Sequence, residues 1–146
     1  MIHPLTRANE EALCALETRA RSGVSARTLK EALESDTQEV LGYHDGTVLT
    51  GYALVTRLPF EAELQAIGVL PERRGEGMGR ALLQAVIVQA RAWQSERVLL
   101  EVRAGNLAAI TLYERLGFGI DGRRKGYYPA IEAAGREDAL LMSRGL

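Results

Sequence analysis

The chain has 146 residues, 47% of them apolar, and its charged side chains nearly cancel to a formal net charge of −1 at pH 7. This length suits one domain with one core, so we expect a single domain over residues 1–146. The balanced charge supplies no field that would favour nucleic acid or an anionic membrane, and we expect neither as a direct partner.

Cysteine usage and hydropathy favour a reducing, cytoplasmic environment. Cys14 is the only cysteine, so an internal disulfide is excluded, and we interpret it as a packing residue. No apolar run reaches the roughly 18 residues that span a bilayer, and the first residues lack a secretory-signal layout. His3 and His44 have no acid or nucleophile nearby in the sequence, and we expect no metal site.

The first part of the chain predicts an edge strand and two short helices. Residues 1–5 are apolar enough for a strand, and Thr6 is expected to cap a helix whose apolar stripe includes Leu13. Gly23 is expected to end that helix, and Ser25 to begin the second one as its capping residue. Two helices are therefore expected before the main strands.

Three β-rich runs follow these helices. Residues 39–43 and 47–58 are joined by a turn that contains Asp45-Gly46, a pair that strongly favours tight hairpins. Residues 62–70 form the next run, which stops at Pro71 because proline lacks the N–H that continues a ladder. These runs predict antiparallel pairing.

In the second half, strands alternate with helices. The periodicity predicts helices over residues 79–93 and 107–116, separated by a strand at residues 97–102. Two more strands are expected near residues 118–128 and 138–143. Such alternation builds parallel pairing through crossovers, so we expect an α/β (α+β) fold with a mixed sheet that is antiparallel first and locally parallel later.

A glycine-rich loop lies between a predicted strand and a predicted helix. Gly75, Gly77 and Gly79 alternate with other residues, and a helix interior would lose about 1 kcal/mol for each glycine relative to alanine. Without β-carbons, the amides at a helix N-terminus approach a phosphate closely, and Arg74 and Arg80 add cationic donors. The pattern favours a pyrophosphate ligand.

Other interpretations of this loop fit less well. A P-loop ends in Gly-Lys-Ser/Thr, whereas Gly79 is followed by Arg80-Ala81. A dinucleotide-binding fingerprint wants a small residue at position 80 and would stand too late in the chain to open a Rossmann domain. A flexible, arginine-rich turn without a ligand remains open, because short glycine motifs have many false positives.

Several motifs together resemble the GNAT acetyltransferases. Arg74-x-x-Gly77-x-Gly79 is similar to the Arg/Gln-x-x-Gly-x-Gly/Ala signature of that family. The RimI-type subgroup, which acetylates the N-terminal amine of a ribosomal protein, is resembled by Leu100-Glu101-Val102-Arg103, Asn106, Ala108-Ala109, Leu112-Tyr113-Glu114, Leu116-Gly117-Phe118, Gly126-Tyr127-Tyr128-Pro129 and Gly135-Arg136-Glu137-Asp138-Ala139. The resemblance covers residues 61–146 closely and the first 60 residues only in layout.

The resemblance implies a GNAT fold, with six to seven mostly antiparallel strands, about four helices, and a splayed parallel pair at the fourth and fifth strands. It implies acetyl-CoA as cosubstrate, with the pantetheine along residues 67–69 and the pyrophosphate at residues 74–80. The residues implied to contact acetyl-CoA are Ile67, Gly68, Val69, Arg74, Gly75, Glu76, Gly77, Met78, Gly79, Arg80 and Asn106. Asn106 is also expected to cap the helix that follows it.

Glu101 is the candidate general base. The strand Val98–Val102 is apolar on both faces, so we expect it to be buried on both, where a carboxylate is out of place. Burial without a partner would raise the pKa of the Glu101 carboxyl toward neutrality, as a base requires, and the resemblance implies the same role. The alternative is a carboxylate paired with Arg103 or with another basic group.

Tyr113 is the candidate general acid. It shares a helix face with Ala109, Leu112 and Leu116, so the residues alone favour a core tyrosine. The resemblance implies that it protonates the departing coenzyme A thiolate. A thiol with a pKa of about 8.5 needs only modest help to leave.

The acceptor is expected to be a protein N-terminus, in particular the N-terminal alanine of a ribosomal protein. An α-amine with a pKa of about 8 is partly neutral at pH 7, whereas a lysine amine at about 10.4 is almost fully protonated. Tyr127, Tyr128 and Arg136 fall where the subgroup grips the acceptor peptide. We expect a monomer or weak oligomer.

One segment departs from the subgroup. RimI-type enzymes carry a Pro-Trp-Ser or similar turn between the first two helices, and here that place reads Arg21-Ser22-Gly23-Val24-Ser25. Two alternatives therefore stay open, namely a GNAT enzyme that acetylates a small-molecule amine and a non-catalytic acyl-CoA-binding module.

Overall fold

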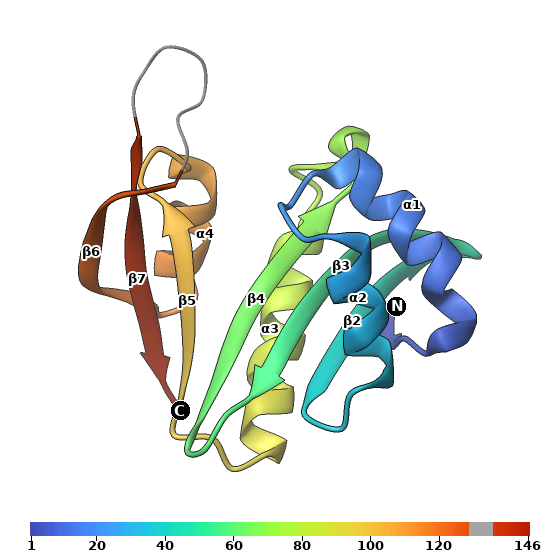
Figure 1. Ribbon diagram of the computed structural model, residues 1–146, viewed down its shortest axis with the longest axis horizontal. Helices are drawn as coiled ribbons and strands as arrows, with labels where there is room; N and C mark the ends of the chain where they lie inside the picture. The colour runs from blue at the N-terminus through green and yellow to red at the C-terminus, as the bar shows by residue number, and fades with distance from the viewer. Residues whose placement is uncertain (129–135) are drawn as a thin grey trace.

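The computed structural model describes residues 1–128 and 136–146, which form one seven-stranded sheet and four α-helices (Figure 1). The strands are β1 (Ile2–Pro4), β2 (Gln38–Asp45), β3 (Val48–Arg57), β4 (Glu61–Val69), β5 (Arg97–Arg103), β6 (Gly119–Tyr128) and β7 (Glu137–Gly145). The helices are α1 (Glu10–Ala20), α2 (Ala26–Glu34), α3 (Met78–Ala92) and α4 (Leu107–Arg115), with 3₁₀ turns η1 (Arg7–Asn9) and η2 (Pro71–Arg73). The sheet order is β1-β2-β3-β4-β5-β7-β6.

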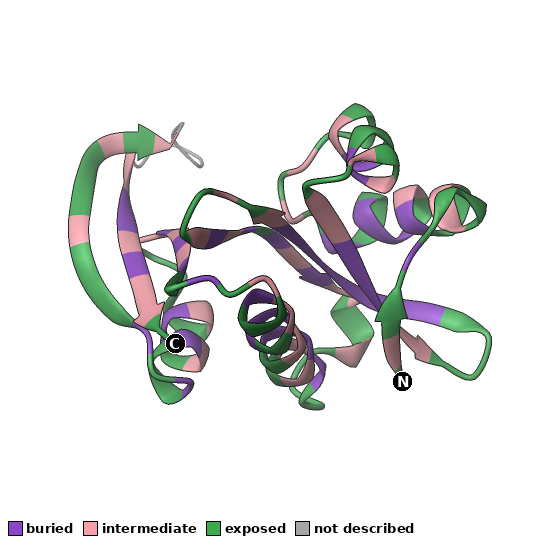
Figure 2. Cartoon of the chain, turned by 90° about the horizontal axis from the view of Figure 1, so that it is seen from below, coloured by how far each residue is buried: buried purple, intermediate pink, exposed green. Residues whose placement is uncertain are grey.

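Helices cover both faces of the sheet, so the core lies in two layers. Helices α1 and α2 cover one face of β2–β4, whereas α3 and α4 lie on the other face (Figures 1 and 2). Buried positions on α1 and α3 face the sheet (Figure 2). Within the described residues, no helix combines the length and apolarity needed to cross a membrane.

The parallel pair β4–β5 is short, and the two strands then separate. Their register runs only from Glu61 opposite Arg97 to Leu64 opposite Leu100. A β-bulge follows at Gln65, and it bends β4 because one strand gains a residue relative to its neighbour. Every other pairing in the sheet is antiparallel. The prediction of a mixed, mostly antiparallel sheet with a splayed parallel pair is confirmed.

The first helix differs from its predicted limits at both ends. Thr6 caps the turn η1 rather than α1, which begins at Glu10. The helix ends at Ala20 because Arg21 adopts a left-handed conformation with φ of 53°, so Gly23 is not its terminal residue. The β2–β3 hairpin is also tighter than expected, since both strands extend to within two residues of each other at Gly46-Thr47.

Candidate active site

A cleft of about 510 Å³ opens where β4 and β5 separate. One wall is the end of β4, and the opposite wall is formed by β5, α4 and the end of β6. The segment between α1 and α2 closes a third side. The lining residues are Arg21, Ser22, Gly23, Val24, Leu64, Gln65, Ala66, Ile67, Leu100, Glu101, Val102, Arg103, Asn106, Ala109, Tyr113 and Tyr128.

The β4 wall offers main-chain groups rather than side chains. The Leu70 N–H donates to the Thr50 carbonyl of β3, at 2.9 Å. Because consecutive residues of a strand point their N–H and C=O groups to alternate sides, those of Ile67 and Val69 point away from β3. β5 no longer pairs with β4 beyond Leu64. An extended chain with amide groups therefore has a free strand edge to pair with.

Gly68 allows α1 to pack closely on this strand. A β-carbon at Gly68 would lie 3.0 Å from a ring carbon of Tyr52 and 3.1 Å from the β-carbon of Ala20. Both contacts are tighter than ordinary packing distances. The expected role of Gly68 beside acetyl-CoA is thus accompanied by a packing role, which brings the end of α1 to the cleft.

The glycine loop leads into the N-terminus of α3. Gly75 and Gly77 have φ values of 82° and 87°, a region that residues with a β-carbon rarely adopt. The amides of residues 75–77 donate to no other described residue, and Met78 begins the helix, whose first-turn amides have no intrahelical acceptor. Gly79 instead lets α4 approach, since its β-carbon would lie 3.3 Å from Leu112. The loop thus presents free donors at the positive end of a helix dipole.

The arginines of this loop differ in how they are engaged. Arg74 donates to the main-chain carbonyl of Ala20 at 2.9 Å, so part of its guanidinium holds the end of α1. Arg80 is exposed and forms no ion pair with another described residue. The Glu76 carboxylate lies 3.0 Å from the Arg73 guanidinium, which neutralises the negative charge of Glu76 within the loop. Arg80 is therefore the arginine most available to an anion.

Glu101 lies on the β5 wall, but its surroundings differ from those expected. Burial alternates along β5, so Glu101 and Arg103 share the less buried face, whereas Val102 packs into the core and only borders the cleft. The prediction that both faces are buried is wrong, because α1 and α2 cover only β2–β4. The Glu101 side chain is 29% exposed and lies 3.4 Å from Arg124. It is paired with a basic group other than Arg103.

Arg103 is engaged elsewhere on the same wall. Its guanidinium lies 3.3 Å from the Glu137 carboxylate and 4.3 Å from the ring centre of Tyr128. These contacts draw Arg103 towards β6 and β7. The Glu101 carboxylate therefore remains accessible from the cleft.

Tyr113 projects from α4 into the same cleft. It is 5% exposed, and its ring packs against Phe118 with centroids 5.9 Å apart. Burial raises the pKa of the Tyr113 phenol to about 12. Its hydroxyl has no hydrogen-bond partner among the described residues. Asn106 accepts the Ala109 N–H at 3.2 Å and so caps α4 as expected, while also lining the cleft.

The two tyrosines expected to contact the acceptor lie at the end of β6. Tyr128 lines the main cleft, and both tyrosines line an adjoining cavity of about 270 Å³ together with Glu63 and Glu101. Their rings meet edge to face, with centroids 5.0 Å apart. Burial, with a contribution from the Glu101 charge, raises the pKa of the Tyr128 phenol.

Arg136 is not brought into either cavity. It donates to the main-chain carbonyls of Gly126 at 2.6 Å and Tyr127 at 3.1 Å, so it holds the end of β6 in place. Pro129 and Gly135, which belong to the motifs that resemble the RimI-type subgroup, lie outside the described residues.

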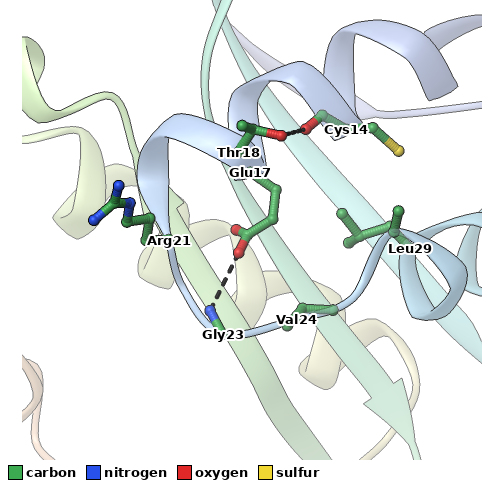
Figure 3. A pocket seen from close by; sticks show the side chains of 8 residues that line it. Cys14, Glu17, Thr18, Arg21, Gly23, Val24 and Leu29 are labelled. Carbon is green, nitrogen blue, oxygen red and sulfur yellow. Dashed lines mark hydrogen bonds between the residues drawn. The ribbon is translucent and has the colours of Figure 1, made fainter. Parts of the chain in front are cut away.

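The sequence interpretation missed a buried polar group beside the cleft. Glu17 on α1 is 8% exposed and accepts a hydrogen bond from Tyr52. It also accepts one from the Gly23 amide, which Figure 3 shows. A signal was present, because Glu17 occupies the helix stripe of Leu13, Leu16 and Ala20, where a carboxylate is out of place. Tyr52 gave no comparable signal, since tyrosine is common in strands.

Comparison with known proteins places the chain in a family. Residues 7–118 match the acetyltransferase (GNAT) family. The [ribosomal protein bS18]-alanine N-acetyltransferase of Escherichia coli K12 is 41% identical over 95 residues, which span 65% of this chain and 63% of that protein. The N-alpha-acetyltransferase RimI of Mycobacterium tuberculosis is 37% identical over 150 residues, covering 98% of this chain and 90% of that protein.

The fold agrees with these sequence matches. The crystal structure of the ribosomal-protein-S18-alanine N-acetyltransferase from Escherichia coli superposes with a TM-score of 0.90 at 32% identity, over 99% of this chain and 92% of that one. A sheet that opens at its parallel pair, beside a glycine loop at a helix N-terminus, defines the class of fold. The chain belongs to the GNAT family of acetyltransferases.

Proposed function

We propose that the chain is an acetyl-CoA-dependent N-acetyltransferase whose acceptor is the N-terminal α-amine of a protein, with the N-terminal alanine of a ribosomal protein as the first candidate. The observation that carries this proposal is one cleft that contains Glu101, Tyr113 and the unpaired edge of β4. The name of the relative from Escherichia coli supports the N-terminal alanine of a ribosomal protein, and the name of the relative from Mycobacterium tuberculosis supports an N-terminal α-amine.

The residues around the cleft fit acetyl-CoA, which supplies an acyl group activated as a thioester. The free main-chain groups of Ile67 and Val69 suit the amides of pantetheine, because they offer strand-like pairing. The amides of residues 75–77, which donate to no described residue, and the first turn of α3 suit the pyrophosphate. Arg80, which is exposed and forms no ion pair with a described residue, adds a cation there.

In this proposal Glu101 removes the proton that the amine must lose. Its carboxylate faces the cleft and is 29% exposed, so a water molecule has access to it. An α-amine with a pKa of about 8 gives up this proton near neutrality, and one carboxylate suffices as acceptor. The amine nitrogen bonds to the acyl carbon directly, without a covalent link to the protein.

Tyr113 supplies a proton to the departing thiolate sulfur as the carbon–sulfur bond breaks. Because the pKa of its phenol is raised to about 12, the hydroxyl keeps its proton throughout the neutral and mildly alkaline range. With no partner among the described residues, that hydroxyl is free to donate into the cleft. Solvent then restores the proton.

The proposal is tested by incubating the purified chain with acetyl-CoA and short peptides that begin with different residues, and measuring thiol release. Peptides with a free N-terminal alanine are expected to turn over. The matched control is the same peptide with its N-terminus already acetylated and an internal lysine present, which is expected to be inert. Equal turnover of both peptides would assign the activity to lysine.

A small-amine acceptor is the second candidate, because the segment that lines the cleft between α1 and α2 carries Ser22, Gly23 and Val24 instead of an aromatic turn. Polyamines and free amino acids belong in the same assay for this reason. Efficient turnover of these amines with inert peptides would replace the proposed acceptor. Acetyl-CoA binding without turnover of any amine would indicate a non-catalytic acyl-CoA-binding module.

A further inference from the structure

A buried carboxylate stands in an unfavourable position at the end of α1. Glu17 belongs to the last turn of this helix, where the helix dipole presents its negative end, and it is only 8% exposed. A carboxylate is costly in such a place unless hydrogen bonds compensate for the lost water. A residue that violates local preference in this way indicates a role outside the helix itself.

Three donors from two other elements satisfy this carboxylate. Its Oε1 atom accepts from the Tyr52 hydroxyl of β3 at 2.7 Å and from the Ser22 hydroxyl at 2.5 Å. Its Oε2 atom accepts the Gly23 amide at 3.1 Å (Figure 3). Glu17 therefore joins α1, the segment after it and the centre of the sheet.

Tyr52 acts as a rigid anchor for this group of hydrogen bonds. It is 0% exposed and packs beside Gly68 on the neighbouring strand, and its hydroxyl lies 2.6 Å from Ser22. Burial raises the pKa of the Tyr52 phenol, so the hydroxyl stays protonated and remains a donor at working pH. The carboxylate thus has a fixed point on the sheet.

The segment that Glu17 holds forms one side of the cleft. Ser22, Gly23 and Val24 line the same cavity as Glu101 and Tyr113, and they come from the opposite side of the sheet opening. These residues lie in the α1–α2 segment, and the glycines of the loop, Gly75, Gly77 and Gly79, do not line this cavity. Their position suits the acceptor rather than the pyrophosphate.

We propose that Glu17 is a positioning residue. It holds the α1–α2 segment in place, so that this segment forms the wall that binds the acceptor residues that follow the N-terminal one. The inference rests on the proposed function, because it assumes a peptide acceptor. It assigns acceptor affinity to a residue that does not line the cleft, and it leaves the proton transfers to Glu101 and Tyr113.

The test is Glu17→Gln, which keeps the size of the side chain but replaces one acceptor oxygen by a donor. We expect the KM for an alanine-initiated peptide to rise about 10-fold, as the loss of a charge-assisted hydrogen bond implies. kcat and acetyl-CoA affinity by calorimetry should stay within about twofold. Alanine amide, which has no further residue for the wall to contact, should keep its KM. Glu11→Gln, an exposed carboxylate on the same helix, is the matched control.

Hydrogen exchange gives a readout that does not depend on activity. In Glu17→Gln, the amides of residues 22–24 should exchange faster, while those of β3 keep their protection. Should Glu17→Gln fail to fold, Ser22→Ala removes a single hydroxyl and is expected to shift the peptide KM in the same direction by a smaller factor.

Two results would overturn the inference. One is an unchanged peptide KM with unchanged exchange at residues 22–24. The other is an equal loss for peptide and alanine amide together with weaker acetyl-CoA binding, which indicates a merely structural role. If the unaltered protein turns over no peptide, the proposed function fails, and the exchange experiment alone decides whether Glu17 holds the segment.

Discussion

The two walls of the cleft are built on different principles. The β4 wall and the glycine loop offer main-chain amides and carbonyls, and their own side chains largely face the core or solvent. The opposite wall offers side chains, with Glu101 on β5, Tyr113 on α4 and Tyr128 on β6. The two walls should therefore differ in their tolerance to substitution. Most substitutions leave a main-chain donor in place, whereas a substitution of a catalytic side chain removes the reacting group.

The largest expected effect tests the side-chain wall. Glu101→Gln removes the proposed base and should lower kcat about 100-fold, the low end for general base catalysis. Acetyl-CoA affinity should change by less than about twofold, since Glu101 lies on the wall away from the glycine loop. Steady-state kinetics from about pH 6 to about pH 9, with calorimetry, measure both quantities.

The exposed Glu96 provides the control, because Glu96→Gln makes the same chemical change just before β5. If Glu101→Gln keeps the activity of the unaltered protein across that pH range, Glu101 is not the base.

The next effect concerns the burial of Tyr113. The pKa of its phenol is raised from 10.0 to about 12 by burial. Below about pH 10 the phenol is therefore neutral in both folded and unfolded chains, and the free energy of unfolding does not depend on its ionisation. As pH rises from about 10 to about 12, the unfolded chain ionises first, and the free energy of unfolding should fall by about 2–3 kcal/mol. Tyr113→Phe should lose less over the same interval, as urea unfolding at the two pH limits would reveal.

Tyr52 is buried in both proteins, so its own ionisation cancels from the comparison between them. Equal losses of stability in the unaltered protein and in Tyr113→Phe would contradict the buried environment of Tyr113.

A smaller effect tests the main-chain wall. Gly77→Val places a β-branched residue at φ of 87°, where the strain of about 2 kcal/mol reshapes the loop. Acetyl-CoA affinity should weaken about 30-fold by calorimetry, with kcat at saturation little changed. Gly119→Val adds the same side chain at an open position in β6 and should leave affinity unchanged. Unaltered affinity in Gly77→Val would remove the loop from the binding site.

The smallest effect concerns Arg136, which holds the end of β6 beside the cleft. Arg136→Ala removes two hydrogen bonds to the β6 main chain but takes no side chain out of the cleft. We expect the KM for peptides to rise about threefold, with kcat for alanine amide unchanged. A loss of kcat near that of Glu101→Gln would instead make Arg136 a direct participant.

Local sequence patterns were sufficient for the elements but not for all of their limits. Helical periodicity predicted residues 79–93 and the structure has α3 at Met78–Ala92, because an amphipathic stripe needs only neighbouring residues. The end of α1 was misplaced, since the left-handed residue that ends the helix is Arg21, at a position where glycine is the usual residue. The single-domain interpretation stays a prediction.

The environment of Glu101 was the clearest failure of sequence reasoning. An apolar strand with one carboxylate indicated burial on both faces, and the sequence cannot reveal that α1 and α2 stop covering the sheet at β4. Its partner, Arg124, lies 23 residues further along the chain. Pairing across such a separation depends on the β5-β7-β6 order of the strands.

The sequence by itself determined the family, the alternation of elements and the glycine loop, because these depend on residue types at short spacing. Only the tertiary structure decided that β4 and β5 separate after Leu64, that Arg74 holds Ala20, and that Glu17 is satisfied by three donors. The Arg74–Ala20 and Tyr52–Glu17 hydrogen bonds join residues distant in sequence, and such contacts are set by how the helices pack on the sheet rather than by any local preference.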